Sequence, residues 1–160
     1  MVTPQALLLA ILMLPLIDTV GSAADVLAEY LTTTLELFTK PAVSDTWPLF
    51  TGNLPDHNSV EDSAAAVHDV SGDYQGKNMN GEEHQRYCVL VCVRAASYRV
   101  AWTKLSATIK TLIALSNRYA TVDERVYTIL NISRESGIVT ESVDSKQRNI
   151  LSVKLLASLK

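Results

Sequence analysis

The amino-acid sequence predicts an all-α fold, a bundle of four to five helices organised on one long central helix over about 80–119 and preceded by a signal peptide. Three observations predict this fold. Apolar residues recur at helical spacing through the central stretch, which contains neither proline nor glycine after Gly81. Capping patterns precede several apolar segments. Sequence signals of β-strands are nearly absent outside residues 87–93.

The central helix is defined by an apolar stripe at i, i+3/i+4 and i+7 spacing. Asn80 followed by Glu83 has the spacing of a capping box at its start. A helix of this length would extend roughly 60 Å, so we expect a kink or break, located at the β-branched patch Val89–Val93. A short buried strand over this patch is the alternative interpretation. The stripe consists of Tyr87, Val91, Tyr98, Trp102, Leu105, Ile109 and Leu112.

The other helices are predicted from shorter apolar stripes and from the residues that flank them. Asn58 with Glu61 and Thr121 with Glu124 repeat the capping-box spacing, and Pro41 ends the first mature helix. Together with residues 80–119, these helices form a single domain over residues 24–160. Their predicted ranges are 25–39, 58–70, 121–135 and 141–159.

Residues 1–23 are predicted to be a secretory signal peptide. Ala6–Ile17 is an apolar run of 12 residues, and small residues follow it, so cleavage is expected after Ala23 or Ser22. The run is too short to cross a bilayer, which needs about 20 residues. No Lys or Arg precedes it, so the alternative is the buried N-terminal helix of an intracellular protein. The predicted localisation is secreted and extracellular, without a stable membrane span.

Composition and charge narrow the class of protein. The chain has 160 residues, of which 48% are hydrophobic and 19% charged, as expected of a globular domain. Its net charge of -3 argues against nucleic-acid binding. The charge is uneven: residues 24–84 carry eleven acids and two bases, and residues 85–160 carry five acids and twelve bases. The two halves either attract each other within one fold or offer a basic face to an acidic partner, an anionic membrane or nucleic acid.

The loop after the first helix contains the candidate partner contacts, Trp47 and Phe50. Prolines and a glycine punctuate this loop, between Pro41 and His57, and its large apolar residues lie between them. Such residues either pin the loop to the core or serve as exposed anchors of a binding surface.

The two cysteines, Cys88 and Cys92, are interpreted as structural thiols. They lie one turn apart if the stretch is helical, where a disulfide would be strained, and too far apart to pair if it is a strand. His84 extends the row at the same spacing, but only neighbouring members could share one metal ion. We therefore predict no metal site and no cofactor.

No catalytic residue is predicted, and the protein is not expected to be an enzyme. The common nucleophile, phosphate-binding, metalloprotease and dinucleotide motifs are missing from the sequence. The carboxylate pairs Glu61–Asp62 and Glu82–Glu83 fall in predicted first helical turns, where acids are favoured electrostatically. Asn131-Ile132-Ser133 is a glycosylation sequon, which makes Asn131 a candidate modification site in a secreted chain.

These observations predict a secreted helical protein that binds another, unidentified protein in the manner of a cytokine or effector. The first alternative is a structural subunit that binds itself through charged helix faces. The second is a carrier of a small apolar ligand, motivated by the aromatic pair Tyr98 and Trp102 and the small residues before it.

Overall fold

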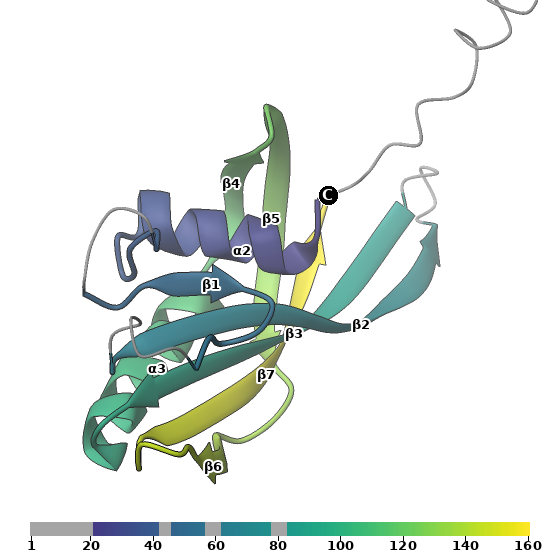
Figure 1. Ribbon diagram of the computed structural model, residues 1–160. Coiled ribbons are helices and arrows are strands. Elements are labelled where there is room, and N and C mark those ends of the chain that lie inside the picture. Colours follow the sequence, from purple (N-terminus) through teal and green to yellow (C-terminus); the bar gives the residue numbers. More distant parts are fainter. Residues whose placement is uncertain (1–20, 42–45, 57–61, 78–82) are drawn as a thin grey trace, which may run out of the picture.

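The structure, a computed structural model, describes residues 21–41, 46–56, 62–77 and 83–160. It shows a curled, mainly antiparallel sheet with two α-helices, so the prediction of an all-α helical bundle is wrong (Figure 1). In chain order the elements are α2 (Ala23–Glu29), the π-helix η1 (Tyr30–Thr34), β1 (Leu49–Thr51), β2 (Ala64–Lys77), β3 (Glu83–Ala95), α3 (Tyr98–Ile113), β4 (Ser116–Val122), β5 (Arg125–Arg134), β6 (Val139–Val143) and β7 (Asn149–Leu159).

The sheet has the strand order β1-β2-β3-β7-β5-β4, with β6 as an additional partner of β7. Among the strand pairs of the described residues, β1–β2 alone is parallel. β5 and β6 lie end to end along one side of β7, pairing with Leu155–Leu159 and Asn149–Ser152 respectively. The strand latest in the sequence therefore holds the centre of the sheet.

Residues 80–119, predicted as one helix, contain a strand, a helix and the start of a hairpin. The alternative interpretation of Val89–Val93 is correct, and that strand, β3, extends well beyond them. In α3 the predicted stripe is buried at Leu105, Ile109 and Leu112. Tyr98 and Trp102 instead lie on the surface, 45% and 43% exposed.

The other predicted helices, apart from the first, are wrong, because the apolar residues of these segments do not distinguish the 3.6-residue period of a helix from the two-residue period of a strand. Residues 58–70 contain the start of β2, residues 121–135 are largely β5, and residues 141–159 contain the end of β6 and all of β7. In β7 the core-facing side chains alternate with Ser152 and Ser158, which are also buried, so the strand shows no simple two-residue alternation.

The pattern Thr121–Glu124 is a hairpin turn rather than a capping box. Val122 pairs with Arg125, and the two residues between them form the turn. Asp123 and Glu124 have φ angles of 48° and 65°, the combination found in type I′ hairpin turns. The capping signals Asn58 and Asn80 lie outside the described residues.

The first predicted mature helix is present, but it is shorter and begins earlier. Ser22 caps α2, and its Oγ accepts a hydrogen bond from the Asp25 N–H at 3.1 Å. The last turn widens into η1, where the Leu35 N–H donates to the Tyr30 carbonyl five residues back. Of the predicted signal peptide, residues 1–20 lie outside the described residues, whereas the Gly21 N–H donates to the Tyr127 hydroxyl at 2.8 Å.

Both helices cover the concave face of the sheet and build one hydrophobic core. α2 contacts β2 and β4, which lie near opposite sides of the sheet, and α3 crosses β3, β7 and β5. The sheet therefore curls around α2 (Figure 1). Alternate residues of the strands point inward, including Ala65, Val67, Val89, Val91, Val93, Ile129, Leu151, Val153, Leu155 and Ala157. Within the described residues, no helix combines the length and apolar character needed to cross a lipid bilayer.

An ion cluster centred on the buried Arg148 joins the loop after β1 to the start of β7. The Arg148 side chain is almost fully buried, and its guanidinium reaches Asp144 at 2.6 Å, Asp56 at 2.5 Å and Asp62 at 3.4 Å. Nearby, Arg94 donates to the Pro55 carbonyl at 2.6 Å. Burial and, secondly, the neighbouring Arg148 lower the pKa of Arg94, and the three aspartates partly offset this. Two acids of the acidic half thus pair with a base of the basic half.

Candidate functional site

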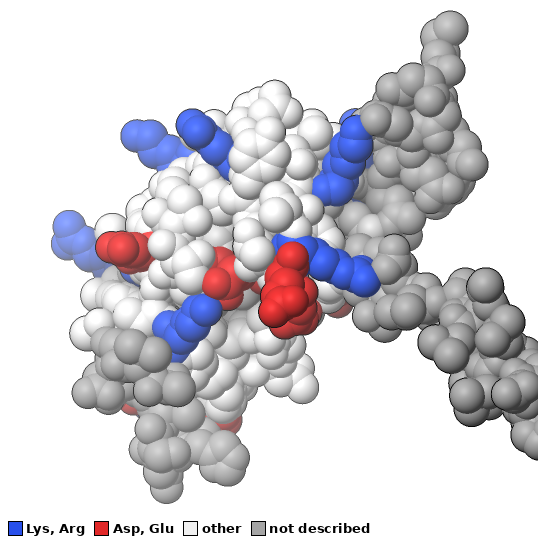
Figure 2. All heavy atoms as spheres, turned by 90° about the horizontal axis from the view of Figure 1, so that it is seen from above, with Lys and Arg blue, Asp and Glu red and all other residues white. Residues whose placement is uncertain are grey.

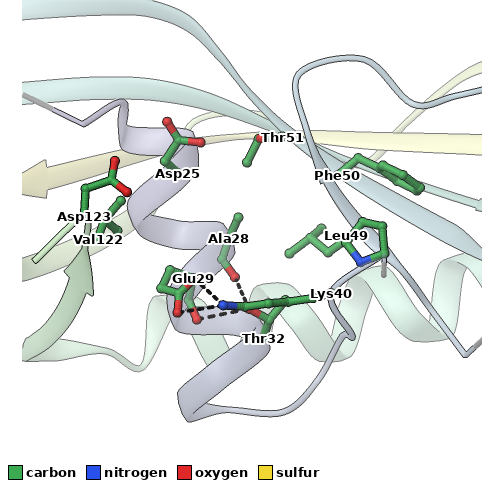
Figure 3. A pocket seen from close by; sticks show the side chains of 11 residues that line it. Asp25, Ala28, Glu29, Thr32, Lys40, Leu49, Phe50, Thr51, Val122 and Asp123 are labelled. Carbon is green, nitrogen blue, oxygen red and sulfur yellow. Dashed lines mark hydrogen bonds and ion pairs between the residues drawn. The ribbon is translucent and has the colours of Figure 1, made fainter. Parts of the chain in front are cut away.

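An open groove of about 500 Å³ lies over α2, between β1 and the β4–β5 turn (Figure 3). We call it the α2 groove. It combines carboxylates, one ammonium group and a few apolar side chains. Its lining residues are Asp25, Ala28, Glu29, Thr32, Lys40, Pro41, Leu49, Phe50, Thr51, Val122 and Asp123.

The helix supplies the floor of the groove because its two sides differ. Val26 and Leu27 are fully buried, while Asp25 and Glu29, one turn apart, are only partly buried and reach the groove. The cap fixes Asp25, since the Ser22 hydroxyl donates to its Oδ2 at 2.8 Å. An acid in the first turn also favours the positive end of the helix.

The β4–β5 turn supplies the carboxylate on the opposite side. Asp123 occupies the first turn position, and the left-handed backbone there holds it beside α2 rather than along the strand. Figure 3 shows Asp123 and Val122 on one side of the helix, with Leu49 and Phe50 on the other. Residues from widely separated parts of the sequence therefore form one surface.

The groove is acidic. Three carboxylates and one ammonium group give its lining a formal charge of -2. Lys40 Nζ lies 2.9 Å from Glu29 Oε2 and 3.1 Å from Oε1, so one acid is already paired. Asp25 and Asp123 remain to attract a cation from outside the chain. Because the groove is open to water, each such exposed pair contributes only about 0.2–1 kcal/mol.

The two predicted contact residues, Trp47 and Phe50, have different surroundings in the structure. Trp47 packs edge-on against Phe38, with ring centroids 6.5 Å apart, and Lys104 Nζ lies 5.1 Å from the Trp47 ring centre. Trp47 therefore pins the loop to the core, while Phe50 lines the α2 groove. Asn131 is exposed on β5, where its Oδ1 accepts a hydrogen bond from the Ser158 hydroxyl.

Sequence reasoning missed the three carboxylates of the groove. One signal was available, because Ser22 and Asp25 have capping-box spacing at the site where a cleavage sequence was proposed. Glu29 and Asp123 are separated by more than ninety residues. Nothing in the sequence indicates that they face the same groove.

The cysteines lie on the sheet face opposite the core valines. They stand four positions apart on one strand, which places their Cα atoms about 13 Å apart, too far for a disulfide with each other. Cys88 Sγ donates to Glu135 at 2.9 Å. Burial, with a smaller contribution from Glu141, raises the pKa of Cys92 to about 11, which suits a structural thiol better than a nucleophile. In the described ranges, no three His, Cys, Asp or Glu side chains converge to hold a metal ion.

Comparison with known proteins finds similarity in structure and none in sequence. No protein-family model matches the sequence, and no curated protein matches it. Among solved structures, the chain is similar to a chain described as "Virion of native gene transfer agent (GTA) particle". The two share 10% sequence identity with a TM-score of 0.45, and the match covers 69% of this chain and 77% of the other.

Proposed function

We propose that the protein is a non-catalytic structural subunit that binds other copies of itself. The observation that supports this proposal is an acidic groove together with a separate segment that carries exposed bases. The α2 groove is acidic, whereas residues 97–122, which contain α3 and β4, carry three exposed bases, Arg99, Lys110 and Arg118, and no acid. The fourth base of this segment, Lys104, is partly buried against aromatic rings. The separation is not complete, because Figure 2 shows one face on which acidic side chains lie near the middle with Lys and Arg side chains beside them.

Charge complementarity between two different surfaces has a geometric consequence. If the acidic surface of one copy meets the basic surface of the next, the contact is heterologous and leaves one surface of each kind unused. Repetition of that contact produces a closed ring or an open chain. Exposed ion pairs are screened by salt, so such an assembly weakens as ionic strength rises.

The experiment measures molar mass by sedimentation and light scattering at low (about 0.05 M) and high (about 1 M) salt. We expect concentration-dependent association at low salt that diminishes at high salt. Glu29→Gln should weaken it, because Glu29 lines the groove. Glu36→Gln makes the same charge change at an exposed residue outside the groove and should leave it unchanged. A monomer at low salt and high concentration would refute the proposal.

A second candidate function is the binding of a different protein through the same groove, by a secreted form of the chain. Phe50 favours it, because a half-buried aromatic ring beside carboxylates suits a partner segment with both apolar and basic residues. It predicts a protein that stays monomeric and whose partner binding is lost when Phe50 is changed to Ala. Recovery of the chain from the medium of a secreting host would support the extracellular setting.

A further inference from the structure

The solvent-facing side of α3 has an unusual composition for an exposed helix. Its inner side is buried at Ala101, Leu105 and Leu112. Its outer side carries large apolar side chains together with cations and no acid, over a helix about 24 Å long. Exposed residues on this outer side, which we call the α3 face, are Tyr98, Arg99, Trp102, Lys110 and Ile113.

One end of the α3 face is already ordered for contact. The rings of Tyr98 and Trp102 stack with centroids 5.9 Å apart and planes 27° apart. The stack restrains Trp102, so less side-chain entropy remains to be lost when a partner covers it. Arg99 lies three residues before Trp102 and is therefore its neighbour on the helix surface. Tryptophan, tyrosine and arginine are the residues most enriched at the energetic centres of protein interfaces.

The α2 groove offers the complementary pattern. Its lining carries the carboxylates of Asp25 and Asp123 and, across α2 from Asp123, the aromatic ring of Phe50. A face with cations and aromatic rings can thus meet a groove with anions and an aromatic ring. The two surfaces belong to different elements of the fold, so both are available on every copy (Figure 1).

We infer that the α3 face of one copy docks in the α2 groove of a second copy, with Arg99 opposite the groove carboxylates and Trp102 against Phe50. This inference rests on the proposed function and specifies its interface. The contact is therefore head-to-tail: each contact joins the α3 face of one copy to the α2 groove of the next.

Two variants, each with one surface blocked, test the arrangement. The groove variant combines Glu29→Lys with Asp123→Asn and keeps its α3 face. The face variant combines Arg99→Glu with Trp102→Ala and keeps its groove. We expect each variant alone to be monomeric. Their equimolar mixture should form a dimer of twice the monomer mass and nothing larger, because only one intact groove meets one intact face.

The control variant combines Lys146→Glu with Val139→Ala, an equal change at exposed residues near β6, and should assemble like the wild type. Circular dichroism and unfolding curves establish that all variants fold. If the wild type assembles but the mixture stays monomeric, or if the face variant assembles alone, this interface is refuted while self-assembly stands. If the wild type never assembles, both proposals fall.

Discussion

Arg148 Nε lies 2.6 Å from Asp144 Oδ2, and Asp144 Oδ1 accepts the backbone N–H of the same arginine at 2.9 Å. The two residues stand at the turn that leads into β7, and both side chains are almost inaccessible to water. Asp144 is thus bound by both the side chain and the backbone N–H of Arg148. The same guanidinium reaches Asp56 and Asp62 from the loop after β1, so this cluster joins distant parts of the chain.

Replacing Arg148 by Met should lower the free energy of unfolding by about 3–5 kcal/mol, because it leaves a buried carboxylate without its counter-charge. Urea unfolding followed by circular dichroism measures the loss. Lys146→Met, at an exposed position two residues away, should change stability by no more than about 0.5 kcal/mol. Equal effects of the two substitutions would show that the buried cluster contributes little.

The stability of the fold should decrease in acid through Asp144. Burial alone would raise the pKa of this carboxyl, but hydrogen bonds from the Arg148 N–H and guanidinium and from the Lys146 N–H outweigh it and lower the pKa below 3.8. The pKa of Asp144 is lower in the folded protein than in the unfolded chain. At a pH between these two values the unfolded chain binds more protons than the folded protein, so the free energy of unfolding rises with pH. The contribution is complete above about pH 4.

This stabilisation should be lost as the pH falls through the folded pKa of Asp144. Unfolding free energies of the wild type and of Asp144→Asn, measured from pH 2 to pH 6, test this expectation. The variant should be less stable at pH 6, and the difference should shrink toward pH 2. A difference that stays constant across the range would assign the effect to lost packing instead.

The β4–β5 turn should become more stable when Glu124 is replaced by Gly. Glu124 has a φ of 65°, a left-handed conformation that disfavours an L-residue by roughly 1–2 kcal/mol and that glycine adopts without strain. Greater flexibility of the unfolded chain offsets part of the gain, so we expect a net increase of about 1 kcal/mol or less.

Gly52→Ala is the control, because it should change the stability in the opposite direction. Gly52 has a φ of 84°, and no atom of the described residues lies within 4 Å of the place that an alanine Cβ would occupy, so the substitution adds backbone strain without a steric clash among them. It should destabilise the protein, and thermal unfolding of both variants separates the two signs. A destabilising Glu124→Gly would indicate that the glutamate side chain makes contacts that outweigh its backbone strain.

The residues around the expected cleavage site should contribute to folding. Ser22→Ala removes the cap of α2 and should cost about 1 kcal/mol. Tyr127→Phe removes the acceptor of the Gly21 N–H and should cost a similar amount. Chemical unfolding measures both, and Ser145→Ala at an exposed turn position is the neutral control. Intact mass of protein from a secreting host would show separately whether cleavage occurs after Ser22 or Ala23.

Sequence patterns predicted two elements in part. α3 was partly predictable, because Leu105, Ile109 and Leu112 recur at helical spacing and all three are buried. The strand at Val89–Val93 was visible as an alternative because its β-branched residues alternate. The exposed pair Tyr98 and Trp102 was misplaced, since apolar identity alone does not distinguish a core residue from a surface one.

The sheet as a whole was hidden by burial on both faces. Ala64–Val67 are all buried, and in β7 only Lys154 is exposed within the strand, so neither segment alternates. The candidate site was even less predictable. Phe50 was named as a candidate contact, which stays a prediction, and the acids of the groove become neighbours only when α2 and the β4–β5 turn meet across the curled sheet.

The position of β7 also determines when the domain can be completed during biosynthesis. β7 pairs with β3 on one side and with β5 and β6 on the other, and it is translated after all of them. Until Asn149–Leu159 have left the ribosome, β3 and β5 have no strand between them. A nascent chain halted before Asn149 should therefore remain unfolded and accessible to proteases and chaperones, and the domain should form only once this last strand is free to insert.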